Sequence, residues 1–127
     1  ICNACGDPNL QKIVAAQSLV GTVSVGVSHS GATKDTVEAL QLARRHKATT
    51  IAITNFAKAP ITFAADIILL TASEDTTLRG VSMSSRVAQL ALNDLLVLGV
   101  ARRRLPEAEE ALKKTADALV TEKIDNP

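Results

Sequence analysis

The sequence has very few aromatic residues. Two phenylalanines are present among 127 residues, with no tryptophan and no tyrosine. Proteins that bind single-stranded nucleic acid stack bases on aromatic side chains, so this scarcity argues against that class of function. It also means that valine, isoleucine, leucine and alanine must fill the core, which is typical of a parallel sheet covered by helices.

The chain also lacks a strong net charge and a long apolar segment. Its formal net charge is +1 at pH 7, which indicates no general attraction to DNA or to an anionic membrane. The longest apolar stretch, residues 87–101, contains Gln89, Asn93 and Asp94 and is too short to span a bilayer. The start of the sequence shows no signal-peptide pattern. We therefore expect a cytoplasmic protein without a membrane partner.

Cysteine is almost absent as well. Cys2 and Cys5 form the single C-x-x-C of the sequence. A zinc site of this kind needs a second pair of ligands, and a redox motif should open a helix, so we expect neither a metal nor a cofactor here. We interpret the two as small buried residues in or near a strand. With no other cysteine, a disulfide framework is excluded.

The length is suited to one domain with a substantial core. The apolar share of 46% and the charged share of 21% are those of an ordinary globular domain. The chain starts at Ile1 without a methionine, in a stretch with the pattern of a strand interior. We expect a single domain over residues 1–127 that is a fragment of a longer protein.

Strand and helix patterns alternate along the chain. Strands are predicted over residues 1–5, 22–27, 49–54 and 66–71, and helices over 8–19, 33–46, 61–65, 84–103 and 106–121. This alternation predicts an α/β fold with a parallel sheet and right-handed crossovers.

Small polar residues follow three of the predicted strands. Ser28–Thr33 follows the second strand, Asn55 the third and Ser73–Glu74 the fourth. In parallel α/β sheets ligands bind beyond the carboxyl ends of the strands. We therefore expect these three loops to converge on one edge of the sheet and to form a site there.

The turn Ser28–Thr33 has the composition of an anion site. Ser28, Ser30 and Thr33 each offer a short hydroxyl, and Gly31 permits close approach of the backbone. The N–H groups of residues 31–34 lack partners at the start of the following helix. A phosphate group suits such a combination of donors and helix end.

Other interpretations of this turn remain open on the residues alone. Ser30 or Thr33 would cap the helix equally well. The G-x-x-x-x-G-K-[ST] of a P-loop is absent, and the glycine spacing does not match a dinucleotide-binding fingerprint. His29 invites a role as a proton shuttle, but no carboxylate is placed by the sequence to orient it, so we interpret it as a polar loop residue.

The segment from Ser28 to Thr36 resembles the S-x-S-G-x-T phosphosugar loop of sugar isomerase (SIS) domains. The similarity covers nearly the whole chain. The match to SIS domains continues through Ile51–Asn55, and two segments, Gly6–Gln11 and Ser84–Asp94, are most similar to the effector domain of RpiR-type bacterial transcription regulators.

The resemblance implies a three-layer αβα sandwich with a flavodoxin-like parallel sheet, here without its first strand and helix. It assigns the phosphate-contacting hydroxyls to Ser28, Ser30 and Thr33, with Gly31 and His29 supplying backbone. Glu74 matches a position that is often acidic near the sugar. The family's first glycine- and serine-containing loop has no counterpart in this sequence.

The resemblance also implies a function. We expect a module that binds a phosphorylated sugar or sugar acid and reports its presence to an N-terminal helix-turn-helix domain outside this chain, which alone would contact DNA. The alternative is a phosphosugar isomerase, which needs an acid and a base near the sugar. Only Glu74 and His29 are candidates for those roles, so we favour a protein that is not an enzyme. A purely structural dimerisation domain is a third possibility.

The predicted helix over residues 84–103 is apolar on nearly all sides. Such a helix is buried against more than one surface. We expect the second surface to be a copy of the same chain in a homodimer or a larger homo-oligomer, because SIS domains commonly pair. A central core helix in a monomer is the alternative.

Overall fold

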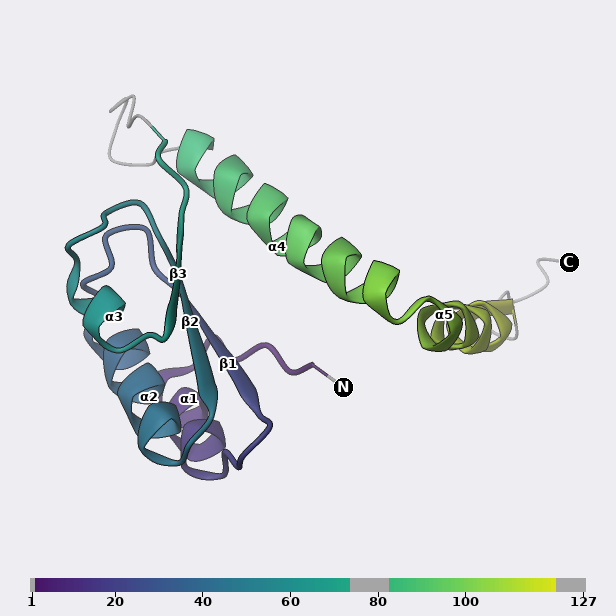
Figure 1. Ribbon diagram of the computed structural model, residues 1–127, viewed down its shortest axis with the longest axis horizontal. Helices are drawn as coiled ribbons and strands as arrows, with labels where there is room; N and C mark the ends of the chain where they lie inside the picture. Colours follow the sequence, from purple (N-terminus) through teal and green to yellow (C-terminus); the bar gives the residue numbers. More distant parts are fainter. Residues whose placement is uncertain (1, 74–82, 121–127) are drawn as a thin grey trace, which may run out of the picture. The chain divides into compact units, whose positions relative to one another are not determined.

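The computed structural model describes residues 2–73 and 83–120, which contain three strands and five helices (Figure 1). By its internal contacts the chain divides into two compact units, Ile1–Leu92 and Asn93–Pro127. The elements in chain order are α1 (Pro8–Ala16), β1 (Val23–Val27), α2 (Lys34–Arg45), β2 (Thr49–Thr54), α3 (Pro60–Phe63), β3 (Ile67–Leu70), α4 (Met83–Arg103) and α5 (Leu105–Val120).

The three strands form one parallel sheet in the order β1-β2-β3. Val25 lies opposite Ile51, which in turn lies opposite Ile67. Helices connect successive strands, so all three carboxyl ends lie on one edge of the sheet. The predicted α/β class and parallel sheet are confirmed.

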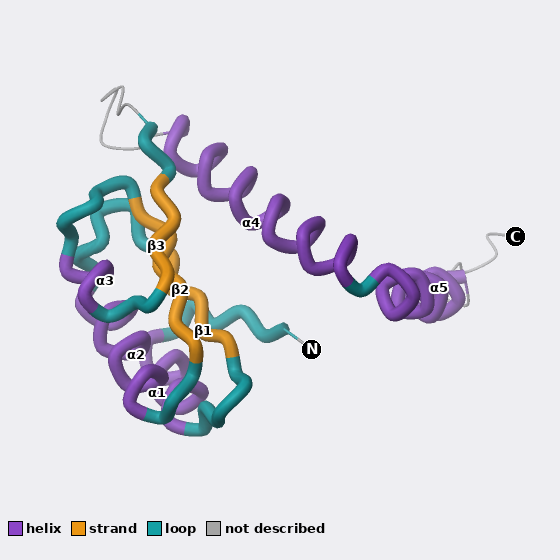
Figure 2. The backbone as a smooth tube through the Cα atoms, viewed as in Figure 1, coloured by secondary structure: helices purple, strands orange, loops and turns teal. Residues whose placement is uncertain are grey.

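Helices α1, α2 and α3 lie on the same side of the strands (Figure 2). The main core cluster lies between the sheet and α2 and α3, and most of its members are small: Leu40, Ala52, Ala59, Ile61, Ala64 and Ala65. Gly26 of β1 faces this cluster, where an added Cβ would lie 3.2 Å from side-chain atoms of both Leu40 and Ile61. Small residues on the strands therefore let the helices approach closely.

Local sequence signals set the ends of the first two helices. Asp7 caps α1, since its carboxylate accepts the N–H groups of Asn9 and Leu10 at 3.0 and 2.9 Å. The helix ends at Ala16, short of the predicted end at residue 19. At the end of α2, Lys47 adopts φ +65°, and Ala48 N–H donates to the carbonyl of Ala43. This is the left-handed helix ending that glycine usually occupies.

The predicted first strand is not formed. The described part of the stretch, residues 2–6, has irregular backbone, and β1 pairs with β2 alone among the described residues. A strand needs a neighbouring strand for its hydrogen bonds, and none lies beside this stretch in the described part of the chain.

Cys2 is exposed and Cys5 half-buried, so the expectation that both are buried is wrong. Within the described ranges no three histidine, cysteine or acidic side chains are grouped for a metal.

Asp66 joins the amino ends of β2 and β3. Its Oδ2 accepts the backbone N–H and the hydroxyl of Thr50 at 2.9 and 2.8 Å, and its Oδ1 lies 3.0 Å from Nε of Arg44. These hydrogen bonds, first the one from the Thr50 backbone, hold the pKa of Asp66 below its ordinary value. The network lies at the end of the sheet opposite the carboxyl edge.

Apolar side chains of α4 and α5 are largely exposed. Leu90 and Leu95 of α4 are each 63% exposed, and Leu112 of α5 is 71% exposed. Leu105, Leu112 and Leu119 recur every seven residues and therefore share one face of α5. No helix in the described segments is long and apolar enough to cross a membrane.

Candidate functional site

The turn Ser28–Thr33 connects the end of β1 to the start of α2 at the carboxyl edge of the sheet (Figure 1). Hydrogen bonds continue past the strand ends and fix it there. The N–H of Ser28 donates to the carbonyl of Ile53 at 3.0 Å, and the N–H of Asn55 donates to the carbonyl of His29 at 3.1 Å. The turn is thus held against the end of β2.

Gly31 lies at the tightest point of this turn. Its φ is +63°, and a Cβ added to it would lie 2.3 Å from Cβ of Ala59 and 2.8 Å from Oγ1 of Thr54. Its carbonyl accepts the N–H of Ile61 at 2.9 Å. Both the backbone conformation and the close approach to α3 require glycine here.

Two of the three predicted hydroxyls bond to each other. Ser28 Oγ and Thr33 Oγ1 are 2.8 Å apart, and Ser28 Oγ also accepts the N–H of Gly31 at 3.1 Å. Ser28 is only 6% exposed, whereas Thr33 is exposed. If Ser28 donates to Thr33, the proton of Thr33 is left to point toward a bound anion.

The structure decides against Thr33 as a side-chain cap of α2. Thr33 occupies the N-cap position, but its hydroxyl makes no capping bond. The first intrahelical bond runs from Val37 N–H to the carbonyl of Thr33, so residues 34–36 have no acceptor within the helix. Ser30 Oγ instead accepts the N–H of Ala32 at 3.3 Å, which is a local turn bond.

His29 contributes its carbonyl to the edge. That oxygen accepts the Asn55 N–H and the hydroxyl of Thr54, both at 3.1 Å. Its ring lies edge-on to Phe56, with ring centroids 5.8 Å apart. The structure thus brings together Ser28, His29, Ser30, Gly31 and Thr33 on one turn, while Glu74 lies outside the described residues.

Asn55 is connected more extensively than the sequence indicates. Its Oδ1 accepts the N–H of Ser73 at 2.7 Å, the hydroxyl of Thr71 at 3.0 Å and the hydroxyl of Ser73 at 3.1 Å. Its Nδ2 donates to the carbonyl of Ser73 at 3.1 Å. The strand-then-asparagine pattern locates this residue at the edge, but nothing in the sequence identifies its partners.

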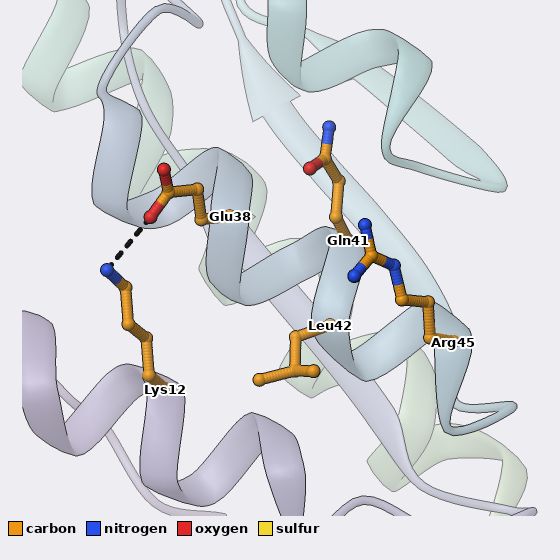
Figure 3. Close-up of a pocket in the computed structure, with 5 residues that line it drawn as sticks. All are labelled: Lys12, Glu38, Gln41, Leu42 and Arg45. Carbon is orange, nitrogen blue, oxygen red and sulfur yellow. Dashed lines mark ion pairs between the residues drawn. The ribbon is translucent and has the colours of Figure 1, made fainter.

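A concavity lies between α1 and α2, with a volume of about 390 Å³ (Figure 3). Lys12 crosses it to reach Glu38, with Nζ 2.8 Å from Oε2, and lies 3.5 Å from a carboxylate oxygen of Asp35. The hydrogen bond between Lys12 and Glu38 raises the pKa of Lys12 and lowers that of Glu38. The Lys12 ammonium is thereby neutralised by carboxylates, which makes this concavity a poor anion site.

Comparison with known proteins assigns the family. The SIS domain model matches residues 10–99. This chain belongs to the SIS domain family. The expectation drawn from the serine- and threonine-containing turn is thereby confirmed at the level of the family.

Similar proteins include regulators of transcription. An uncharacterized HTH-type transcriptional regulator of Caldanaerobacter subterraneus is 40% identical over 125 residues, which are 98% of this chain and 44% of the relative. A second uncharacterized HTH-type transcriptional regulator, from Haemophilus influenzae, is 28% identical over 96% of this chain and 42% of the relative. The structure of Vibrio vulnificus NanR complexed with ManNAc-6P is similar with a TM-score of 0.82 and 27% identity, covering 96% of this chain and 46% of that one. The chain spans less than half the length of these relatives.

Proposed function

We propose that this SIS domain binds a phosphorylated sugar or sugar acid and controls DNA binding by a helix-turn-helix domain of the same protein. The observation that carries the proposal is the hydroxyl-rich turn, whose Thr33 leaves the start of α2 uncapped. Similarity to HTH-type regulators and to a regulator complexed with ManNAc-6P supports the same function.

In this proposal the phosphate lies over the turn and the first turn of α2. Thr33 and Ser30 donate their hydroxyl protons, and the N–H groups of residues 34–36 complete the set of donors. Ser28 is buried and acts through Thr33, whose oxygen it holds at 2.8 Å. The positive end of the helix dipole favours the phosphate charge. Asp35 lies nearby, but it belongs to a cluster in which Lys12 and Lys34 balance the charges of Asp35 and Glu38.

A thermal-shift screen with ManNAc-6P, glucosamine 6-phosphate and glucose 6-phosphate tests the proposal. A ligand at 100 times its Kd should add about 2.7 kcal/mol to the stability of the folded state. We expect one of the three to raise Tm, and Ser30→Ala to remove most of that rise. Ser24→Ala, a matched change within β1, should keep it. If no compound raises Tm of the wild-type protein, the proposal is wrong.

The same samples separate a sensor from an enzyme. A regulator should leave the stabilising sugar phosphate unchanged during prolonged incubation, and the ligand should alter DNA binding by the complete protein. Conversion of the compound to its aldose or ketose isomer would instead identify an isomerase.

We further propose that the protein acts in the cytoplasm, where its DNA target would lie.

We also propose that the protein is a homodimer or larger homo-oligomer that pairs through its C-terminal helices. The exposed leucines at 105, 112 and 119 form an apolar stripe on α5 that a second copy would cover. Leu112→Glu should shift the mass in sedimentation analysis toward the monomer. Lys113→Glu places the same new side chain one residue further along and should leave the mass unchanged. Equal masses for both variants would contradict this interface.

A further inference from the structure

We infer that Asn55 is a positioning residue that gives the carboxyl edge its specificity for the sugar part of the ligand. It does so by holding the exit of β3, Thr71–Ser73, with hydroxyl oxygens presented as hydrogen-bond acceptors. This inference rests on the proposed function and goes beyond it, because it assigns separate places to the phosphate and to the sugar hydroxyls.

The hydrogen bonds of Asn55 fix where the hydroxyl protons point. The hydroxyls of Thr71 and Ser73 lie 3.0 and 3.1 Å from Asn55 Oδ1, which also accepts the N–H of Ser73 at 2.7 Å. The Thr71 hydroxyl has a second acceptor in the carbonyl of Thr54 at 3.5 Å. A hydroxyl has one proton and two acceptor lone pairs. Because these protons are directed at oxygens of the protein, each hydroxyl oxygen offers its lone pairs to a ligand.

Two kinds of surface therefore face a ligand along one edge. The turn after β1 offers donors, from Thr33, Ser30 and the first N–H groups of α2, and donors suit phosphate oxygens. The exit of β3 offers acceptors, which repel phosphate oxygens but accept hydrogen bonds from sugar hydroxyls. The end of β2 separates the two, because Asn55 also donates its N–H to the carbonyl of His29.

The backbone at the β3 exit is held in a conformation that it would otherwise avoid. Ala72 has φ +46°, a region that residues with a Cβ rarely adopt. The main chain of Ser73 is held by both of its polar groups, with its N–H at 2.7 Å from Asn55 Oδ1 and its carbonyl at 3.1 Å from Asn55 Nδ2. An amide side chain supplies this acceptor and donor together, which explains asparagine rather than aspartate.

Isothermal titration of the complete protein with inorganic phosphate and with ManNAc-6P, glucosamine 6-phosphate and glucose 6-phosphate tests the inference. We expect Asn55→Ala to weaken binding of the tightest sugar phosphate about tenfold, the equivalent of losing one or two hydrogen bonds. Its Kd for inorganic phosphate should change by less than about threefold. The decisive readout is the Kd for inorganic phosphate divided by the Kd for the sugar phosphate, because a general loss of structure would weaken binding of both compounds alike.

A second variant keeps the test valid if Asn55→Ala does not fold. Ser73→Ala removes one acceptor oxygen and keeps both main-chain bonds to Asn55, so it should lower the same ratio by about threefold to tenfold. Ser24→Ala serves as the control and should leave the ratio unchanged.

Three results would count against the inference or against the proposed function, and they can be told apart. If the variants weaken phosphate and sugar phosphate equally, Asn55 has only a structural role and the inference is wrong. If the wild-type protein binds inorganic phosphate as tightly as every sugar phosphate, the sugar-recognising role of the β3 exit is wrong while the anion site stands. If the wild-type protein binds none of the four compounds, the proposed function itself fails.

Discussion

Substituting Gly31 by alanine should destabilise the protein more than the same substitution at Gly21 or Gly26. The added Cβ would lie 2.3 Å from Cβ of Ala59 and 3.0 Å from Cγ2 of Ile61, and φ at this position is +63°. The contact with Ala59 involves an atom fixed to the backbone, so rotating a side chain cannot relieve it. The turn or the start of α3 must move instead.

The expected loss of stability has two parts. Placing an L-residue in the left-handed region costs about 1–2 kcal/mol. Overpacking a close contact costs about 1–3 kcal/mol more. The sum, about 2–5 kcal/mol, is a large share of the roughly 5–15 kcal/mol that stabilises a typical domain. Gly31→Ala should therefore lower the urea midpoint markedly, and it should also weaken ligand binding, because the turn carries Ser28 and Thr33.

Substitutions at two other glycines separate the conformational cost from the packing cost. Gly21 has φ +92° with nothing within 4 Å of an added Cβ, so Gly21→Ala should lose only the conformational part, about 1–2 kcal/mol. Gly26 has no positive φ, but a Cβ there would lie 3.2 Å from the ends of Leu40 and Ile61. Gly26→Ala changes only the packing, and its effect should be smaller than that of Gly31→Ala because these flexible side-chain ends can shift by a few tenths of an ångström.

Equilibrium urea unfolding, followed by far-UV circular dichroism, measures all three variants. We expect Gly31→Ala to be the least stable. Combining it with Ala59→Gly should recover much of the packing part, because the clashing methyl is then gone. If Gly31→Ala is no less stable than Gly21→Ala, the turn does not approach Ala59 and α3 as closely as these distances indicate.

Two further substitutions test features away from the turn. Hydrogen bonds from Thr50 lower the pKa of Asp66, so its carboxylate stabilises the fold above the unfolded-state pKa of about 3.9 and loses this effect as pH falls through the lower folded-state pKa. Asp66→Asn should therefore be less stable than the wild-type protein at pH 6, and the difference in unfolding free energy should shrink below about pH 4 in urea titrations. A difference that stays constant with pH would contradict the network. Lys47→Gly should raise stability by about 0.5–1 kcal/mol, because Lys47 has φ +65° at the end of α2, and a lower urea midpoint would show that its side chain matters more than its backbone.

Most elements can be predicted because their patterns are local. The strand predicted over residues 49–54 has the bounds of β2, and α2 begins and ends within one residue of its predicted range. Both have strong internal periodicity and clear ends. The stretch over residues 1–5 has a strand-like composition as well, but a strand also needs a neighbour, and composition says nothing about whether one is present.

The location of the candidate site is also predictable, whereas its hydrogen bonds are not. Hydroxyls and glycine after a valine-rich strand identify Ser28–Thr33, because the end of a parallel strand is a fixed place in such a fold. Whether Thr33 caps α2 or bonds to Ser28 depends on one side-chain rotation, and the sequence is compatible with both. The positive φ of Ala72 has no sequence signal, because glycine or asparagine normally marks such a position.

The direction of the hydroxyl protons distinguishes the two sides of this edge. Serine and threonine occur at both, so composition alone predicts a uniform polar surface. At the turn after β1, the oxygens of Ser28 and Thr33 share one proton between them, which leaves the other available for an anion. At the β3 exit, the hydroxyls of Thr71 and Ser73 donate to oxygens of the protein, chiefly Asn55 Oδ1, and present lone pairs. A phosphate and a polyol need these opposite polarities, so a ligand that carries both would have one favoured orientation along the edge.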